Sequence, residues 1–211
     1  ENHNPTGAFK IRGGLNLIAR LSADERRGVA TASTGNHGQS IALACQLTGV
    51  RCSVFVPLGN NPEKNAAMRA FGAVVEEGGR DFDDARELCE RAGRDRGARY
   101  VHSANEPHLI AGVATYALEI FEELPDADVI VVPVGGGSGA CGNCLVRTAI
   151  GAATRVIGVQ AERADAFTRS FRTGQRVVGE SADTFAEGMA TRVVFDFTFE
   201  MLQRELDEVV V

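Results

Sequence analysis

The hydrophobic positions of the chain fall into short apolar runs separated by longer segments with helical spacing. The apolar runs of the first half predict strands at 28–32, 51–56, 73–76 and 99–101. Between them, apolar residues recur every three or four positions, which predicts helices at 37–47, 62–71 and 81–94. Ser22 and Glu25 have the spacing of a capping box, which predicts a short helix at 23–27.

The second half repeats this alternation. It is expected to contain strands at 128–134, 155–160 and 208–211 and helices at 107–124, 140–150, 164–173 and 196–205. The first of these strands shows almost no alternation, which is typical of a strand buried on both faces. Repeated strand–helix–strand units predict the α/β class, with a parallel sheet covered by helices on both faces. A domain boundary is expected near 105–107.

Composition and charge narrow the class of protein. The 211 residues are 44% hydrophobic and 24% charged, which is the balance of a globular protein that can bury a core. The net charge is -6 and no block of basic residues occurs, which argues against nucleic acid or a membrane as a partner. The most apolar run, 129–134, ends in glycines and is too short for a membrane-spanning helix.

Cysteine and lysine usage adds two expectations. The five cysteines are odd in number and no secretory segment is present, which predicts a reducing, cytoplasmic compartment. Cys141 and Cys144 form a C-x-x-C pair without a second pair at zinc spacing, so we expect them to pack within a helix. Lysine-dependent chemistry has two possible positions, Lys10 and Lys64. The chain opens at Glu1 directly on a dense motif, so we expect further sequence upstream.

Three polar or glycine-rich segments lie at junctions where open α/β sheets bind ligands. In the first, Pro5 and Gly7 predict a tight turn before Lys10 enters a helix. A lysine in such a place loses solvation, its pKa falls, and its neutral amine can attack a carbonyl carbon. A surface lysine whose stem packs along Phe9 is the structural alternative.

The second segment runs from Thr31 to Gln39, before the helix predicted at 37–47. Hydroxyl groups, an amide and free N–H groups at a helix N-terminus form a seat for a carboxylate. An ordinary Ser/Thr or Asx turn that caps the helix would use the same residue types.

The third segment, 134–142, has four glycines among the five positions 135–139. Consecutive glycines between a strand and a helix expose several N–H groups to one anion, most often a phosphate. Gly137, Gly139 and Gly142 also form a G-x-G-x-x-G, and Glu162 follows about twenty residues later. Taken alone, this segment leaves a dinucleotide-dependent oxidoreductase and a purely structural turn open.

Taken together, the segments Asn4 to Arg12, Ser33 to Gly38 and Gly135 to Gly139 resemble the fold type II (β-family) pyridoxal-phosphate enzymes. The order and separation of the three motifs match that family, and similarity to its threonine dehydratase and serine dehydratase-racemase branch covers the whole chain. Glu106 to Gly112 and Ala186 to Thr191 look like further landmarks of that branch. A dinucleotide site would leave the first two motifs unexplained.

The resemblance implies a tryptophan synthase β-like fold, with two open, mainly parallel twisted sheets and helices on both faces. Residues 28–105 would form a small domain that carries the substrate loop. Residues 1–27 and 106–211 would form part of a large cofactor domain. Family members are considerably longer, so the chain is expected to be a central segment, and the residue that bonds the pyridine nitrogen would lie past Val211.

The resemblance also assigns residues to the cofactor, pyridoxal 5′-phosphate. Lys10 would form the aldimine with it and, once released, take the α-proton of the substrate. Asn36 would hydrogen-bond the 3′-oxygen of the pyridine ring. The phosphate would be held by Gly135, Gly136, Gly137 and Ser138.

For the substrate, the resemblance implies that Ser33, Thr34 and His37 belong to the loop that binds its carboxylate. Thr34 also occupies the position where serine racemases use a catalytic serine hydroxyl, on the cofactor face opposite the lysine. A threonine keeps that hydroxyl, although β-branching restricts its rotamers.

The implied activity is an ammonia-lyase, or dehydratase, that converts threonine or serine to a 2-oxo acid and ammonia by β-elimination. The partner would be a small amino-acid substrate, and a homodimer or tetramer is the expected assembly. Threonine synthase, serine racemase and β-replacement enzymes of the same family are alternatives. A dinucleotide-dependent oxidoreductase is a more remote one, and a catalytically silent binding module that keeps the fold is another.

One departure from the family concerns metal binding. The dehydratase-racemase branch often binds Mg²⁺ or Ca²⁺ through a glutamate, a backbone carbonyl and an aspartate after the strand at 155–159. The corresponding positions here are Gln160, Ala164 and Ala166, which lack the charged oxygens that a hard cation prefers. We therefore expect no metal at this place.

Overall fold

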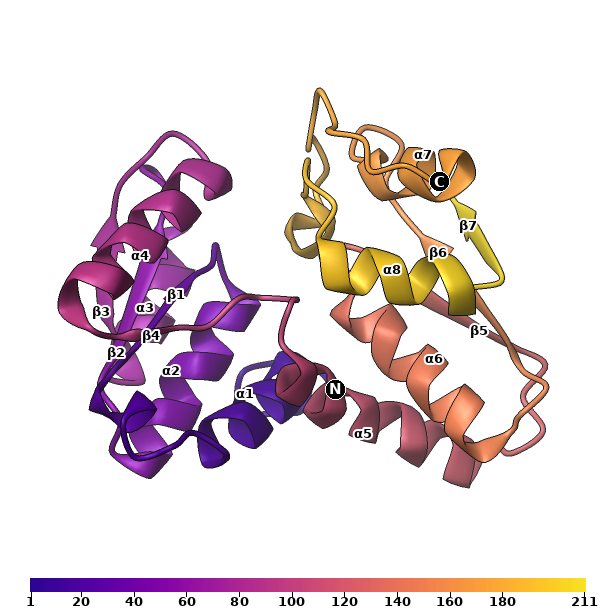
Figure 1. Ribbon diagram of the computed structural model, residues 1–211, viewed down its shortest axis with the longest axis horizontal. Coiled ribbons are helices and arrows are strands. Elements are labelled where there is room, and N and C mark those ends of the chain that lie inside the picture. Colours follow the sequence, from indigo (N-terminus) through magenta and orange to yellow (C-terminus); the bar gives the residue numbers. More distant parts are fainter. The chain divides into compact units, whose positions relative to one another are not determined.

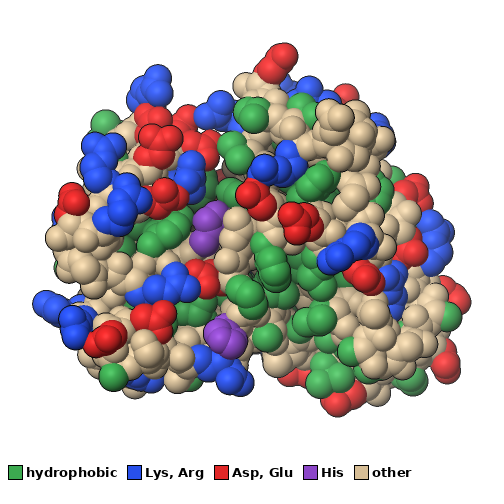
Figure 2. All heavy atoms as spheres, viewed as in Figure 1, with side chains coloured by type: hydrophobic (Ala, Val, Ile, Leu, Met, Phe, Trp, Pro, Cys, Tyr) green, Lys and Arg blue, Asp and Glu red, His purple; other side chains and the backbone are tan.

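A computed structural model describes residues 1–211 (Figure 1). The chain divides into two compact units, Glu1–Gly112 and Val113–Val211. Acidic and basic side chains are interspersed over the visible face of each unit (Figure 2), so neither presents a broad patch of one charge there. None of the helices combines the length and the apolar character that crossing a bilayer would require.

The first unit is built around a four-stranded sheet. Its elements are α1 (Lys10–Ala19), the short 3₁₀ helix η1 (Glu25–Arg27), β1 (Val29–Ala32), α2 (Asn36–Thr48), β2 (Cys52–Val56), α3 (Pro62–Ala70), β3 (Val74–Glu77), α4 (Phe82–Arg96), β4 (Arg99–Tyr100) and the start of α5 (Pro107–Glu123). The strand order is β3-β2-β1-β4 and every pairing is parallel. Asn61 and Asp81 accept hydrogen bonds from first-turn N–H groups of α3 and α4, which explains where these helices begin.

Side chains of this first sheet alternate between two covered faces. The face that packs against α4 is formed by Ala30, Ala32 and Phe55, which surround Cys89 of that helix. Val54 points the other way, toward Gly38 of α2. The expected arrangement of a parallel sheet between helices is confirmed here.

The second unit contains a three-stranded sheet. Its elements are the rest of α5, β5 (Val129–Pro133), α6 (Ser138–Ile150), β6 (Arg155–Val159), α7 (Ala166–Thr173), the 3₁₀ helix η2 (Glu187–Met189), α8 (Asp196–Glu205) and β7 (Glu208–Val210). The strand order is β5-β6-β7, again with parallel pairing throughout. Helix α6 packs on β5 and β6 and contacts α8, which places the glycine-rich segment at the carboxyl end of β5.

One strand differs from the expectation. Val129 and Val131 of β5 are 43% and 63% exposed, whereas the next residue, Val132, is buried. The prediction that this strand is buried on both faces is therefore wrong for the described chain. All residues of this strand are apolar, so both of its faces are hydrophobic. The face that contains Val129 and Val131 is not covered by other residues of the described chain.

Candidate active site

Lys10 is the first residue of α1 and is half-buried. Its Nζ donates a hydrogen bond to the carbonyl oxygen of Ser103, at 3.4 Å, and lies 5.3 Å from the ring centroid of Phe9. Its own carbonyl oxygen accepts a hydrogen bond of 2.6 Å from Ser40 Oγ of α2. A Cβ on Gly14 would lie 2.2 Å from the same hydroxyl, so a glycine is required for α1 to approach α2 this closely.

The carbonyl group beside Lys10 belongs to a tight turn that sequence reasoning did not identify. His102 Nδ1 accepts hydrogen bonds from the N–H groups of Ala104 and Asn105, both at 3.0 Å. These hydrogen bonds form a turn around the imidazole of His102, in which the carbonyl oxygen of Ser103 faces Lys10 Nζ. Only a lone histidine after a predicted strand marked this position in the sequence, which is too weak a signal for such a role.

The segment from Ser33 to His37 joins β1 to α2, as predicted. Ser33 and His37 are buried, Thr34 is half-buried and Asn36 is exposed. Ser33 Oγ accepts a hydrogen bond from the N–H group of Gly35, at 3.1 Å. No side chain caps the start of α2, so the N–H groups of its first turn are available to an anion.

A second lysine covers this loop. A Cβ on Gly35 would lie 2.8 Å from Cδ and 3.2 Å from Nζ of Lys64, on α3. Any larger residue at position 35 would therefore displace the lysine side chain. This contact explains why a glycine occupies this position in the loop.

The side chain of His37 is buried, at 5% exposed. Its Nε2 lies 2.8 Å from Thr31 Oγ1, and the same hydroxyl donates to the carbonyl oxygen of Val101, also at 2.8 Å. Burial lowers the pKa of His37 well below its usual value, and electrostatic interactions with Lys10 and His102 lower it further. The imidazole is therefore neutral at physiological pH.

In the second unit, the glycine-rich segment connects β5 to α6. Gly137 has a φ of 92°, in the left-handed region that favours glycine, and immediately precedes the helix. Ser138 is 2% exposed and begins α6, whose start has no side-chain cap. The backbone N–H groups of this first turn are therefore donors for an anion.

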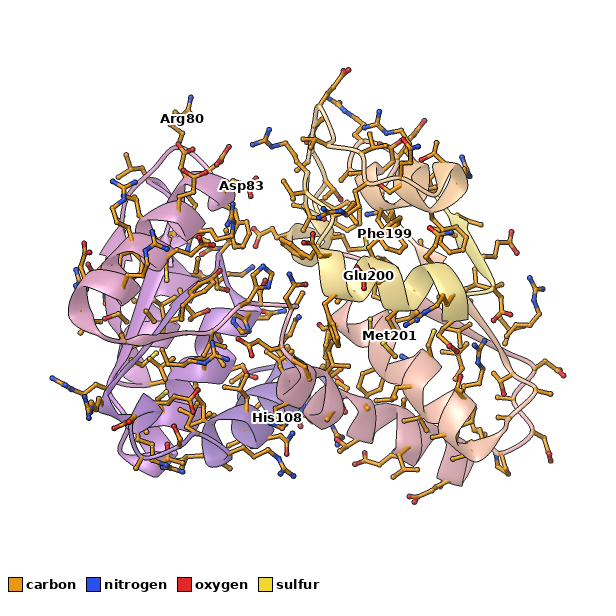
Figure 3. All side chains as sticks on the ribbon, viewed as in Figure 1. Arg80, Asp83, His108, Phe199, Glu200 and Met201 are labelled. Atoms are coloured by element: carbon orange, nitrogen blue, oxygen red, sulfur yellow. The ribbon has the colours of Figure 1, made fainter.

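Two segments from later in the chain, η2 and α8, contact the glycine-rich loop. A Cβ on Gly135 would lie 2.3 Å from the carbonyl oxygen of Gly188, within η2. Thr198 Oγ1 of α8 donates to the carbonyl oxygen of Gly136 at 2.8 Å. Helix α8, on which Figure 3 labels Phe199, Glu200 and Met201, lies beside the start of α6. In the sequence, residues 186–191 are recognisable only as a landmark, and no local pattern marks Thr198.

The side chain of Gln160 hydrogen-bonds to the backbone at the end of β5, where the glycine-rich loop begins. It is 2% exposed; its Nε2 donates to the carbonyl oxygen of Val134, and its Oε1 accepts from the N–H and hydroxyl groups of Thr168 at 2.7 and 3.0 Å. Both ends of the amide are thus used within the protein. Nowhere in residues 1–211 do three or more His, Cys, Asp or Glu side chains gather as metal ligands would.

The model of a family described as "Pyridoxal-phosphate dependent enzyme" matches residues 1–211, the whole chain. The chain belongs to this family. The glycine-rich segment is therefore part of a pyridoxal-phosphate enzyme, and the alternative of a dinucleotide-dependent oxidoreductase is set aside.

Individual relatives narrow the branch of the family. An L-threonine ammonia-lyase from Thermotoga maritima is 43% identical over 211 residues, which are 100% of this chain and 53% of that protein. A serine racemase from Schizosaccharomyces pombe is 32% identical over 99% of this chain and 65% of its own length. The solved structure of a processed threonine deaminase isoform from Solanum lycopersicum has a TM-score of 0.93 at 34% identity, covering 100% of this chain and 62% of that one. The chain thus spans about half the length of the Thermotoga maritima enzyme.

The residues of this family member fit its cofactor. The carbonyl group of Gly188 lies so close to Gly135 that no side chain fits at position 135. The loop therefore presents backbone N–H groups, which suit a phosphate. A half-buried primary amine at Lys10 suits the carbonyl carbon of the cofactor. Lys10 and the Ser33–His37 loop lie together in the first unit, whereas the glycine-rich segment lies in the second, and each set is described within its own unit.

Proposed function

We propose that this chain is the central part of an ammonia-lyase that converts threonine or serine to a 2-oxo acid and ammonia. The observation that carries this proposal is the 43% identity, over the whole chain, to an L-threonine ammonia-lyase. The likeness in fold to a threonine deaminase, with a TM-score of 0.93, supports it independently of individual residues.

In this proposal, Lys10 is the attachment point of pyridoxal phosphate. Asn36 donates from its exposed amide to the 3′-oxygen of the ring. When bound, pyridoxal phosphate supplies an electron sink for negative charge at the α-carbon of an amino acid. The phosphate is held by the backbone N–H groups of Gly135, Gly136, Gly137 and Ser138.

The first-turn N–H groups of α2 bind the substrate carboxylate, together with the hydroxyls of Ser33 and Thr34. Lys10 Nζ takes the α-proton, which is the task of a neutral amine with a neighbouring acceptor that orients it. The β-hydroxyl leaves as water and a water is taken up again on hydrolysis. The net reaction turns one hydroxy amino acid into one 2-oxo acid and one ammonia, with no external oxidant.

A second candidate is racemisation, favoured by the similarity to a serine racemase and by the hydroxyl of Thr34. A racemase needs a second proton-transferring group on the face opposite the lysine, and Thr34 would be that group. Threonine synthase and β-replacement activity stay alternatives within the family. These activities differ in their products, so they can be separated in one set of reactions.

The test is to incubate the full-length protein with L-threonine and with L-serine and to measure ammonia, 2-oxo acid and the chirality of the remaining amino acid. We expect stoichiometric ammonia and 2-oxo acid. Lys10→Ala should lower this rate by roughly a thousandfold or more, because the attachment point and the base are both lost. Lys64→Arg, which keeps a long cationic side chain over Gly35, should retain most of it.

Two outcomes would contradict the proposal. A D-amino acid formed without ammonia would assign the racemase. No turnover of either substrate by a protein that has bound pyridoxal phosphate would exclude the lyase.

We further propose a homodimer or tetramer in the cytoplasm. The family resemblance supports the assembly, and five buried free thiols support a reducing compartment. Light scattering coupled to size-exclusion chromatography measures the assembly directly, and a monomeric mass would contradict this part of the proposal.

A further inference from the structure

The hydrogen bonds around His37 determine which of its ring nitrogens carries the proton. The hydroxyl of Thr31 has a single proton, and it is engaged with the carbonyl oxygen of Val101, which can only accept. The 2.8 Å contact between Thr31 Oγ1 and His37 Nε2 must therefore use a proton on the ring nitrogen. His37 is thus the Nε2–H tautomer.

The other ring nitrogen, Nδ1, then has a free lone pair. It is buried, and no donor group of the protein reaches it. Buried polar atoms in native proteins are almost always paired, because an unpaired buried acceptor has lost its hydrogen bonds to water and gained none in return. Since Nδ1 belongs to the loop that the proposed function assigns to the substrate, this acceptor has the properties of a ligand-binding group.

The chemistry of the lone pair selects the group it can bind. A carboxylate offers acceptors alone, so it would be repelled by Nδ1. The ammonium and hydroxyl groups of a hydroxy amino acid are donors and suit it. The side chain of His37 is therefore unsuited to the carboxylate contact implied by family resemblance, which falls to the N–H groups at the start of α2.

We propose that Thr31 is a positioning residue, whose hydroxyl holds His37 as the Nε2–H tautomer so that Nδ1 accepts a hydrogen bond from a donor group of the amino-acid substrate. This inference rests on the proposed function for the identity of the ligand. Thr31 itself is completely buried in β1. It acts through the ring of His37.

The first test reads the tautomer without reference to activity. In full-length protein labelled with ¹⁵N-histidine, long-range ¹H–¹⁵N spectra distinguish a protonated from an unprotonated ring nitrogen. We expect a protonated Nε2 and an unprotonated Nδ1 for His37, assigned from the spectrum of His37→Gln. An Nδ1–H tautomer or an imidazolium at pH 7 would overturn the proposal even if the enzyme is an active lyase.

The second test uses three threonine variants. Thr31→Val removes the hydroxyl at nearly constant shape and should raise the KM for L-threonine about five- to tenfold, with a smaller change in kcat, as expected for one hydrogen bond. Thr31→Ser keeps the hydroxyl and should restore the wild-type KM. Thr154→Val is the matched control, because Thr154 is also buried and its hydroxyl donates to a backbone carbonyl, that of Ala127, rather than sharing a contact with a histidine ring as Thr31 does.

A competitor that cannot undergo β-elimination identifies the donor. L-2-Aminobutyrate has the ammonium group of threonine and lacks its hydroxyl. A raised inhibition constant in Thr31→Val assigns the ammonium as the donor, and an unchanged constant together with a raised KM assigns the hydroxyl. A KM that is unchanged in Thr31→Val, or raised as much in Thr154→Val, would overturn the proposal.

Discussion

Two histidines in the first unit, the buried His37 and the half-buried His102, are held in their neutral form. Burial is the largest cause of the lowered pKa of His37, followed by the charge of Lys10. Burial also lowers the pKa of His102 to about 4, with contributions from Arg86 and Lys10. Protonation of His102 would abolish the acceptor that receives the N–H groups of the turn beside Lys10. Neutral imidazoles are therefore part of how this site is built.

These pKa values predict how stability depends on pH. In the unfolded chain His102 takes up a proton near pH 6.5, whereas in the folded protein it does so near pH 4, so the unfolded state binds more protons between these values. Stability is therefore lost as the pH falls below about 6.5, by about 2 kcal/mol at pH 5 for this residue. His102→Asn keeps an acceptor and cannot be protonated, so it should reduce the difference between urea midpoints at pH 7 and pH 5.

The control is His108→Asn, which changes an exposed histidine at the start of α5 (Figure 3). It should leave the pH dependence as in the wild type. An unchanged pH dependence in His102→Asn as well would contradict the assignment of this loss of stability to His102.

Single residues were predictable where a local motif marks them and unpredictable where a distant contact decides. Ser33 and Asn36 stand in a recognisable pattern at a strand-to-helix junction, where the structure places them. The tautomer of His37 depends on Val101, which lies 70 residues from Thr31. The turn around His102 likewise has no sequence pattern of its own. The roles of the predicted site residues stay predictions.

At the scale of elements, the strand–helix alternation was sufficient to predict every strand and the longer helices to within a few residues. Strand β5 shows that the same pattern does not predict which residues of a strand are exposed. An apolar run indicates that both faces are hydrophobic, but exposure depends on which elements lie nearby, and Val131 is 63% exposed. The packing of η2 against the glycine-rich loop was missed for the same reason, because it joins segments far apart in the chain.

That packing gives a prediction for the loop. Gly135→Ala would bring a Cβ to 2.3 Å from the carbonyl oxygen of Gly188, so the backbone of one segment must move. Overpacking of this kind costs about 1–3 kcal/mol, and a displaced loop loses N–H donors to the phosphate. We expect Gly135→Ala to release pyridoxal phosphate on gel filtration at concentrations where the wild type retains it.

The matched variant changes the other partner of the same contact. Gly188 is exposed and a Cβ there meets no atom within 4 Å, so Gly188→Ala should retain the cofactor as the wild type does. Equal retention by both variants would show that the contact between η2 and the loop is unimportant for holding the phosphate.

At the scale of the whole molecule, family and fold were predictable from the sequence because three motifs occur in the right order and at the right separation. The limits of the domains, 28–105 against the flanking segments, stay a prediction. In the structure the chain divides into two units after Gly112, within α5. A helix that runs through this point carries no local signal for a boundary, which is why hydrophobic periodicity does not locate it.

The central claim is that Lys10 carries pyridoxal phosphate, and it is tested most directly by covalent trapping. Full-length protein is incubated with pyridoxal phosphate, reduced with borohydride to make the attachment permanent, and digested for mass spectrometry. Because residues 1–211 contain two lysines, Lys10 and Lys64, the labelled peptide of this region identifies its site without ambiguity. We predict the label on Lys10. A label confined to Lys64, or a folded full-length protein with neither lysine labelled, would contradict the account.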